Sequence, residues 1–169
     1  MRFTEVLPGD DGAIRALSVL AAGIIKEYYD PLLGAEQNDY MIELFQSPEA
    51  ITEQLYHGYR YHVVKDDAGE PVGFLAAYPR KTEWYLSKFY LKADARGKGY
   101  GRKMMDFTAE EAKKAGFDTI ALNVNRFNPT VAIYRHLGFT VRREEKNDIG
   151  CGYYMDDYVM EYRIDGGNK

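Results

Sequence analysis

The spacing of apolar residues in the first third of the chain is typical of helices preceded by one short strand. Phe3 to Val6 predicts that strand. Asp10 or Asp11 can cap the helix that follows, because a carboxylate accepts hydrogen bonds from the first amides of a helix. The apolar positions of this helix recur at helical spacing, at Ile14, Leu17, Leu20, Ala21 and Ile24. Between Tyr28 and Gly58 the pattern predicts one or two further helices, the second beginning at Ser47-Pro48-Glu49.

From Tyr59 onward the pattern is typical of short strands separated by two helices. One helix follows a glycine-rich loop and runs to about Ala115, and the other covers Pro129 to Leu137. Strands are expected at Tyr59 to Val64, Val72 to Tyr78, Trp84 to Leu91, Thr119 to Val124, Phe139 to Asp148 and Tyr153 to Ile164. This order predicts an α/β fold with one mixed sheet of about six to seven strands and about four helices. We expect a single domain over residues 1–164 and a flexible tail over residues 165–169.

Composition narrows the class of protein. Hydrophobic residues make up 46% and charged residues 28% of the 169 positions, which is typical of a soluble globular protein. The net charge of -4 has the wrong sign for a protein that binds phosphate backbones, so no nucleic-acid partner is expected. The sequence shows neither a membrane-spanning apolar run nor a signal peptide, so we expect a cytoplasmic protein without a membrane partner. The single cysteine, Cys151, excludes an internal disulfide, and no metal-ligand spacing is present.

The segment Arg96-Gly97-Lys98-Gly99-Tyr100-Gly101 lies between an expected strand and an expected helix. Its glycines allow backbone N–H groups to converge on an anion, and the positive end of the helix dipole favours negative charge there. Arg102 and Lys103 add to the positive charge of the loop. The loop matches neither the P-loop nor the G-x-G-x-x-G fingerprint, because Arg102 stands where the third glycine of that fingerprint would be. A phosphate or pyrophosphate group is therefore the expected ligand.

Two motifs in this order resemble the signature of the GNAT superfamily of N-acetyltransferases. The first, Arg/Gln-x-x-Gly-x-Gly/Ala, is matched at Arg96, Gly99 and Gly101. The second, Asn-x-x-Ala-x-x-x-Tyr-x-x-x-Gly-Phe, is matched at Asn128, Tyr134, Gly138 and Phe139. The chain is one residue shorter than the second pattern before Tyr134, so Thr130 takes the place of the small residue, and Asn125 is an alternative to Asn128. The resemblance is clear from about Tyr59 to Val141.

The resemblance implies a cleft for acetyl-coenzyme A between two splayed parallel strands, here Trp84 to Leu91 and Thr119 to Val124. Backbone groups of Phe89 and Leu91 would pair with the pantetheine arm. Backbone N–H groups from Gly97 to Gly101 would hold the pyrophosphate. The residues expected to bind the cofactor are thus Phe89, Tyr90, Leu91, Arg96, Gly97, Lys98, Gly99, Tyr100, Gly101, Arg102 and either Asn125 or Asn128.

The same resemblance implies that Tyr134 is the general acid. An amine attacks the thioester and expels a thiolate. A thiol has a pKa of about 8.5 and is mostly protonated at neutral pH, so a nearby acid that donates a proton helps the thiolate to leave. The base is left open between a chain of water molecules and several carboxylates, namely Glu83, Glu144, Glu145, Asp156 and Asp157. Each of these carboxylates is expected to be solvated at the surface rather than to act as the base.

The expected acceptor is a primary amine of a small molecule or of a peptide. The stretch from Tyr40 to Glu49 is similar to bacterial members related to polyamine acetyltransferases, and the acidic residues of the final hairpin would attract a basic acceptor. The alternative function is a non-catalytic acyl-CoA-binding regulator on the same fold, against which the presence of Tyr134 argues. The sequence does not decide between a monomer and a homodimer.

Overall fold

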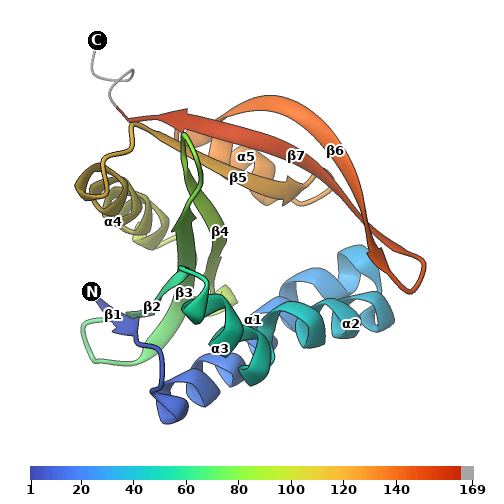
Figure 1. The fold of residues 1–169 in the computed structure, drawn as a ribbon, viewed down its shortest axis with the longest axis horizontal. Helices are drawn as coiled ribbons and strands as arrows, with labels where there is room; N and C mark the ends of the chain where they lie inside the picture. Colours follow the sequence, from blue (N-terminus) through green and yellow to red (C-terminus); the bar gives the residue numbers. More distant parts are fainter. Residues whose placement is uncertain (165–169) are drawn as a thin grey trace. The chain divides into compact units, whose positions relative to one another are not determined.

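A computed structural model describes residues 1–164, and the chain forms two compact units (Figure 1). Unit 1 comprises residues 1–78 and 88–101, and unit 2 comprises residues 79–87 and the chain from Arg102 onward. Residues 1–164 form five α-helices and seven strands, in the sheet order β1-β2-β3-β4-β5-β7-β6. The predicted α/β class with a mixed sheet is confirmed. The tail expected at residues 165–169 lies outside the described residues, and the single domain stays a prediction.

Unit 1 packs three helices against antiparallel strands. Its strands are β1 (Arg2–Val6), β2 (Arg60–Lys65), β3 (Pro71–Pro79) and the second half of β4 (Trp84–Leu91). Its helices are α1 (Asp11–Leu33), α2 (Ala35–Gln46) and α3 (Pro48–Tyr56). Strands β1, β2 and β3 pair antiparallel in chain order. The core of the unit includes Leu17 and Ile24 of α1 with Tyr61 and Phe74 of the strands, all of them buried.

Two of the three helices of unit 1, α1 and α3, begin where capping residues predict. The Asp10 carboxylate accepts a hydrogen bond from the Ala13 amide at 3.1 Å, and the Ser47 hydroxyl accepts one from the Ala50 amide at 3.2 Å. Helix α1 differs from the expectation because it runs past Tyr28 and includes Pro31 near its end. It stops at Gly34, whose φ is 86°. None of the helices within residues 1–164 has the length and apolar character needed to cross a membrane.

Strand β4 approaches β3 closely at Gly73. The Lys92 amide donates to the Val72 carbonyl at 2.8 Å. A Cβ added at Gly73 would lie 2.3 Å from the carbonyl oxygen of Tyr90 and 2.9 Å from a methyl carbon of Leu91. Gly73 has no positive φ, so the close approach of β4, rather than an unusual backbone conformation, explains the glycine.

Unit 2 contains the first half of β4 and the later elements of the chain. These are α4 (Tyr100–Lys114), which enters the unit at Arg102, and then β5 (Thr119–Asn125), α5 (Thr130–His136), β6 (Thr140–Gly150) and β7 (Tyr153–Arg163). Trp84 and Tyr85 of β4 pair in parallel with Ile120 and Ala121 of β5. The β5–β7 and β7–β6 pairs are antiparallel. The parallel arrangement expected of β4 and β5 is therefore present.

The strands of unit 2 have an apolar face and a polar face, because successive side chains of a strand point to opposite sides. Tyr162 of β7 lies on the apolar face, where its ring packs 5.5 Å from that of Phe139. Phe139 in turn packs 5.7 Å from Tyr134 of α5, so α5 covers this face. Asn123 of β5 and Asp157 of β7 lie on the polar face.

We predict that Gly73→Ala destabilises the protein by about 1–3 kcal/mol, the usual cost of overpacking, because the new methyl group meets the backbone of β4. The matched control is Gly23→Ala in α1, where an added Cβ meets nothing within 4 Å. This control should raise stability by about 0.5–1 kcal/mol, the advantage of alanine over glycine inside a helix. Chemical denaturation measures both, and equal midpoints for Gly73→Ala and wild type would contradict the close packing.

Candidate active site

The glycine-rich loop of unit 1 connects the 3-10 helix η1 (Ala93–Ala95) to α4. Gly97 and Gly99 adopt the left-handed backbone conformation, with φ of 77° and 81°. A Cβ added at Gly97, Gly99 or Gly101 would meet no atom within 4 Å. At Gly101, neither a positive φ nor packing requires glycine, so this position leaves space beside the backbone at the start of α4. This open loop at a helix N-terminus fits a phosphate group.

Arg96 is held within unit 1 by two contacts. Its guanidinium donates a hydrogen bond to the Leu91 carbonyl at 2.8 Å and stacks 4.1 Å from the ring centre of Tyr28 in α1. Burial raises the pKa of the Tyr28 hydroxyl, and the charge of Arg96 acts in the opposite direction. Arg96 therefore fixes the path of the chain from β4 into the loop, in addition to the charge that the sequence predicted there. Lys98 is exposed in the loop, and Arg102 is exposed on α4.

The second half of β4 carries Phe89, Tyr90 and Leu91, which the sequence predicts as cofactor-binding residues. Tyr90 faces the helices of unit 1, where its ring packs 6.2 Å from that of Tyr29 and 5.3 Å from that of Phe74. The Leu91 carbonyl already accepts the hydrogen bond from Arg96. The Tyr90 side chain thus belongs to the core of unit 1, which leaves its backbone as the group able to meet a ligand.

Lys88 is a half-buried cation on the same side of β4 as Tyr90. Its ammonium nitrogen lies 5.3 Å from the ring centre of Phe45 in α2. No carboxylate within residues 1–164 forms an ion pair with it. Burial lowers the pKa of the Lys88 ammonium to about 8.

Tyr134 of unit 2 is buried, with 9% of its surface exposed. The Phe139 amide donates to the Tyr134 carbonyl at 2.9 Å, and the two rings meet edge to face. A Cβ added at Gly138, whose φ is 110°, would lie 2.9 Å from the Tyr162 ring. The second motif therefore has a clear packing role: Gly138 and Phe139 fix α5 on the sheet and so fix Tyr134.

Asn125 and Asn128 shape the turn between β5 and α5. The Asn125 side-chain oxygen accepts a hydrogen bond from the Phe127 amide, and that of Asn128 accepts one from the Thr130 amide, both at 2.9 Å. Asn128 is buried, with 4% of its surface exposed, whereas Asn125 is half-buried. Both side-chain oxygens thus serve the local backbone, and a contact of either residue with the cofactor stays a prediction.

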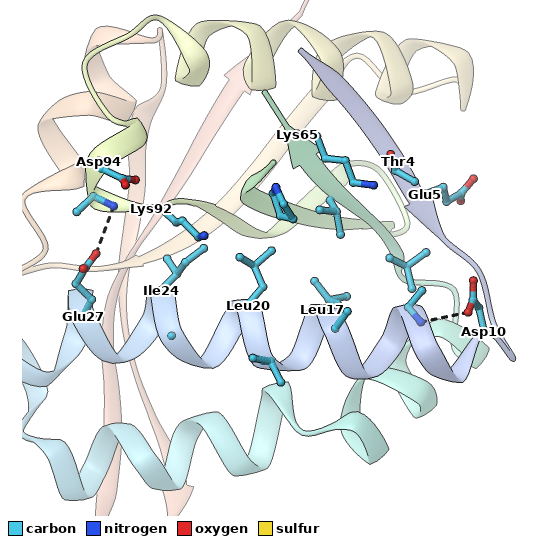
Figure 2. Close-up of a pocket in the computed structure, with 18 residues that line it drawn as sticks. Thr4, Glu5, Asp10, Leu17, Leu20, Ile24, Glu27, Lys65, Lys92 and Asp94 are labelled. Atoms are coloured by element: carbon cyan, nitrogen blue, oxygen red, sulfur yellow. Dashed lines mark hydrogen bonds between the residues drawn. The ribbon is translucent and has the colours of Figure 1, made fainter. Parts of the chain in front are cut away.

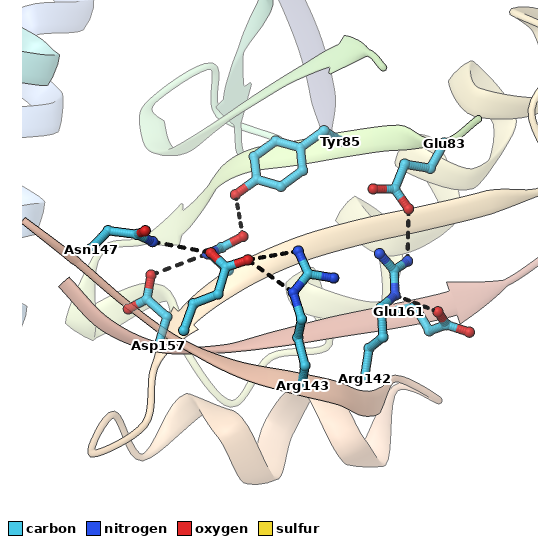
Figure 3. Close-up of polar contacts among 9 residues, drawn as sticks. Glu83, Tyr85, Arg142, Arg143, Asn147, Asp157 and Glu161 are labelled. Carbon is cyan, nitrogen blue, oxygen red and sulfur yellow. Dashed lines mark hydrogen bonds and ion pairs between the residues drawn. The ribbon is translucent and has the colours of Figure 1, made fainter. Parts of the chain in front are cut away.

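A hydrogen-bonded chain runs across the polar face of unit 2 (Figure 3). The Tyr85 hydroxyl of β4 donates to the Asn123 side-chain oxygen of β5 at 2.7 Å. The Asn123 side-chain nitrogen donates to Asp157 of β7 at 3.3 Å and to Glu145 of β6 at 3.4 Å. The strand register explains this meeting, because Asp157 lies opposite Glu145 on β6 and opposite Asn125 on β5. Each of four neighbouring strands therefore contributes one side chain to this hydrogen-bonded chain.

Four of the five carboxylates considered as the base form ion pairs with arginines. Arg126 bridges Glu144 and Asp156, Arg142 binds Glu83, and Arg143 binds Glu145. Asp157 differs from them: only 2% of its surface is exposed, and its side-chain partner is the neutral Asn123. The expectation that Asp157 is a solvated surface carboxylate is therefore wrong. Residues 1–164 hold no group of three or more His, Cys, Asp or Glu side chains suited to a metal ion.

The environment of Asp157 opposes its ionisation. Burial raises the pKa of its carboxyl to about 6, the hydrogen bond from Asn123 partly offsets this, and the charges of Glu145 and Asp156 raise it further. The neighbouring Glu145 behaves in the opposite way, because Asn147 and Arg143 lower its pKa. Two carboxylates on one polar face thus ionise in different pH ranges.

Unit 1 also contains a large apolar cavity of about 740 Å³ (Figure 2). It lies along α1, where Leu17, Leu20 and Ile24 line it, and Lys65 and Lys92 contribute to the opposite wall. Glu27 closes one end by accepting a hydrogen bond from the Ala93 amide at 3.3 Å. The residues predicted to bind the cofactor do not line this cavity.

Sequence reasoning missed Tyr85 and Asn123 and gave Lys88 no role. One signal was available: Asn123 is a polar residue inside the otherwise apolar run Ile120 to Val124. A polar side chain on a central strand needs a hydrogen-bond partner. The partner itself depends on the strand register, which the pattern does not give.

The chain belongs to the GNAT acetyltransferase family, whose model matches residues 24–139. No curated protein matches the sequence. The structure is similar to PaiA N-acetyltransferase from Thermoplasma acidophilum in complex with coenzyme A, with 20% identity, a TM-score of 0.76, and 96% of this chain and 99% of that chain covered. It is also similar to a chimera of the spermidine N-acetyltransferase SpeG of Vibrio cholerae with hSSAT, with 18% identity, a TM-score of 0.68, and coverage of 99% and 98%.

A third similar structure is YncA, a putative acetyltransferase from Salmonella typhimurium with its cofactor acetyl-CoA. The identity is 18%, the TM-score is 0.60, and 97% of this chain and 95% of that chain are covered. At these levels of identity, the similarity shows the fold alone. Together with the family match, it confirms the predicted GNAT fold.

We predict that Asp157→Asn stabilises the protein at neutral pH. A carboxyl that ionises at about pH 6 in the fold, against an ordinary value of 3.8, destabilises the folded state at neutral pH by about 3 kcal/mol. Because the folded-state pKa is raised, this destabilisation develops as pH rises between these two values and is absent at lower pH. Thermal unfolding should therefore show a higher melting temperature for the variant at neutral pH and no gain at about pH 4.

The control for this prediction is Asp156→Asn, the adjacent residue on the other face of β7. Asp156 is paired with Arg126 at 2.9 Å, so its amide variant gains no stability at neutral pH. An equal gain in both variants would show that net charge, rather than burial of the Asp157 carboxylate, is the cause.

Proposed function

We propose that this chain is an N-acetyltransferase that moves the acetyl group of acetyl-coenzyme A to a primary amine of a small molecule or peptide. The observation that carries the proposal is the open glycine loop Arg96–Gly101 at the start of α4, in a chain of the GNAT family. PaiA and YncA, which share the fold, were crystallised with coenzyme A and acetyl-CoA respectively, which supports the same donor here.

The loop would hold the pyrophosphate of the donor through its backbone. Anions bind well to amides at a helix N-terminus, and α4 has no acidic residue in its first turn to oppose one. Lys98 and Arg102 are exposed and would add charge-assisted contacts. Backbone groups of Phe89 and Leu91 would meet the pantetheine arm, and Arg96 would act mainly by holding the loop through its bond to Leu91.

Tyr134 would protonate the thiolate that leaves. The packing of Phe139 and Gly138 against the sheet holds its ring in one orientation, which a positioned general acid requires. The donor supplies an activated acetyl group, so the protein needs no nucleophile of its own.

A basic acceptor such as a polyamine remains the first class to test. The SpeG chimera named above is a spermidine N-acetyltransferase, which favours this class. The argument from the acidic hairpin is weaker than its sequence suggests, because Arg126, Arg142 and Arg143 neutralise most of its carboxylates locally. The unpaired charge of the polar face resides chiefly at Asp157 once that residue ionises.

We predict that wild-type protein binds acetyl-CoA in calorimetry and that Gly101→Leu weakens this binding at least about tenfold. The leucine side chain would fill the space beside the loop backbone and displace hydrogen bonds worth about 1.5–3 kcal/mol to a charged group. Turnover is measured as thiol release across polyamines, amino acids, aminoglycosides and peptides. Absence of acetyl-CoA binding by wild type would refute the proposal, and binding without turnover on any amine would favour the non-catalytic alternative.

We predict that Tyr134→Phe lowers turnover by about 10²-fold or more, the usual contribution of a general acid, and leaves the affinity for acetyl-CoA unchanged. The substitution removes only the hydroxyl, so the edge-to-face packing on Phe139 is retained. Single-turnover rates are the appropriate measurement, because slow product release would hide a change in the chemical step. An unchanged rate would show that another group protonates the thiolate.

A further inference from the structure

The polar face of unit 2 contains one carboxylate that differs from all its neighbours. Asp157 is buried, and its side-chain hydrogen bond comes from the neutral amide of Asn123. A buried carboxylate is stable as an anion when a cation or several donors compensate for the lost water, and Asp157 has only one long hydrogen bond of 3.3 Å. Such a group is the best proton acceptor among the five carboxylates considered as the base, because the other four are tied to arginines.

The hydrogen bond between Asn123 and Asp157 has a fixed direction. The Tyr85 hydroxyl donates to the Asn123 oxygen at 2.7 Å, so the Asn123 nitrogen must point toward β7 and donate. The guanidinium of Arg80 stacks 3.6 Å from the centre of the Tyr85 ring and restrains it. The chain Arg80–Tyr85–Asn123 thus sets the orientation of the Asp157 carboxylate.

We propose that Asp157 is the general base of the acetyl transfer and that Asn123, oriented by Tyr85, is its positioning residue. This inference rests on the proposed function. The acceptor's ammonium group would lose one N–H proton to the Asp157 carboxylate, and the free amine would attack the thioester carbonyl. As the C–S bond breaks, the thiolate takes a proton from Tyr134, and the new C–N bond leaves an amide. The acylated nitrogen then loses its second proton to the Tyr134 phenolate, which restores the Tyr134 hydroxyl. Asp157 releases its proton to solvent.

The charged groups around Asp157 in unit 2 allow this assignment to be tested by pH. Strand β5 presents the neutral Asn123 and Asn125, β6 presents Glu145 with its partner Arg143, and β7 itself contributes Asp156, which Arg126 binds. Tyr85 of strand β4 acts on Asp157 only indirectly, through its hydrogen bond to Asn123. Burial raises the pKa of Asp157 to about 6, whereas Glu145 has a lowered pKa, so Asp157 accounts for a loss of activity as pH falls through about 6. Lys88 of unit 1 titrates higher, at about 8.

The experiment is the pH profile of kcat/KM for the best amine acceptor with wild type, Asp157→Asn, Asn123→Ala and the control Asp156→Asn. We expect Asp157→Asn to lose about 10²-fold or more near neutral pH and to lose the decline centred at about pH 6. Asn123→Ala keeps the carboxylate but removes the donor that lowers its pKa, so the decline should move to higher pH. The maximal rate should fall by less than in Asp157→Asn, because the carboxylate loses only the group that orients it. Asp156→Asn should keep the maximal rate and move the decline only slightly to lower pH, because the charge of Asp156 makes the smallest contribution to the raised pKa of Asp157.

Calorimetry with acetyl-CoA and thermal unfolding on the same four proteins separate the possible failures. If Asp157→Asn folds, binds acetyl-CoA and retains the wild-type profile, Asp157 is not the base, while the proposed function stands. If Asp157→Asn does not fold, an unmoved profile in Asn123→Ala would equally overturn the proposal. If wild type acetylates no amine, the proposed function itself fails.

Discussion

The bond from the Arg96 guanidinium to the Leu91 carbonyl is the contact on which the cofactor side of the protein depends. It joins the end of β4 to the start of the glycine loop, and the stacking of Arg96 on Tyr28 fixes the same point to α1. Gly73 allows β4 to lie against β3 just before this bond. The loop can therefore remain open, with glycines that touch no other part of the protein, because its first residue is held firmly.

The sequence predicted most elements of the fold because their signals are local. Strand β4 has the expected bounds, Ser47 caps α3, and the glycine loop precedes α4. The extent of α1 was not predicted: the helix runs past Tyr28 and includes Pro31, although a proline inside a helix removes one backbone hydrogen bond. The burial of Asp157 was not predictable either. Asp156 and Asp157 are adjacent and chemically identical, and only the pairing of β7 with β5 and β6 decides which one points to the polar face.

The local charge of unit 2 depends on its ion pairs rather than on the net charge of the chain. The net charge of -4 and the acidic hairpin suggested a surface that attracts cations. The arginines of β6 and of the turn after β5 instead pair with Glu83, Glu144, Glu145, Asp156 and Glu161. Exposed pairs of this kind add little to stability, but they remove charge locally. Among the five carboxylates considered as the base, Asp157 alone lacks a cationic partner, and burial also opposes its ionisation.

The proposed acid and base lie on opposite faces of the same strands, which limits where a substrate can meet both. Tyr134 is fixed through Phe139 and Tyr162 on the apolar face, and Asp157 lies on the polar face. Two such groups can act on one pair of reacting atoms where the sheet ends or where neighbouring strands separate, because elsewhere the backbone lies between them. Asp157 lies opposite Asn125, the last residue of β5, and the turn that Asn125 begins leads directly into α5. The proposed reaction therefore requires an opening of this kind within reach of Asp157, at the carboxyl end of β5, and of Tyr134 on α5.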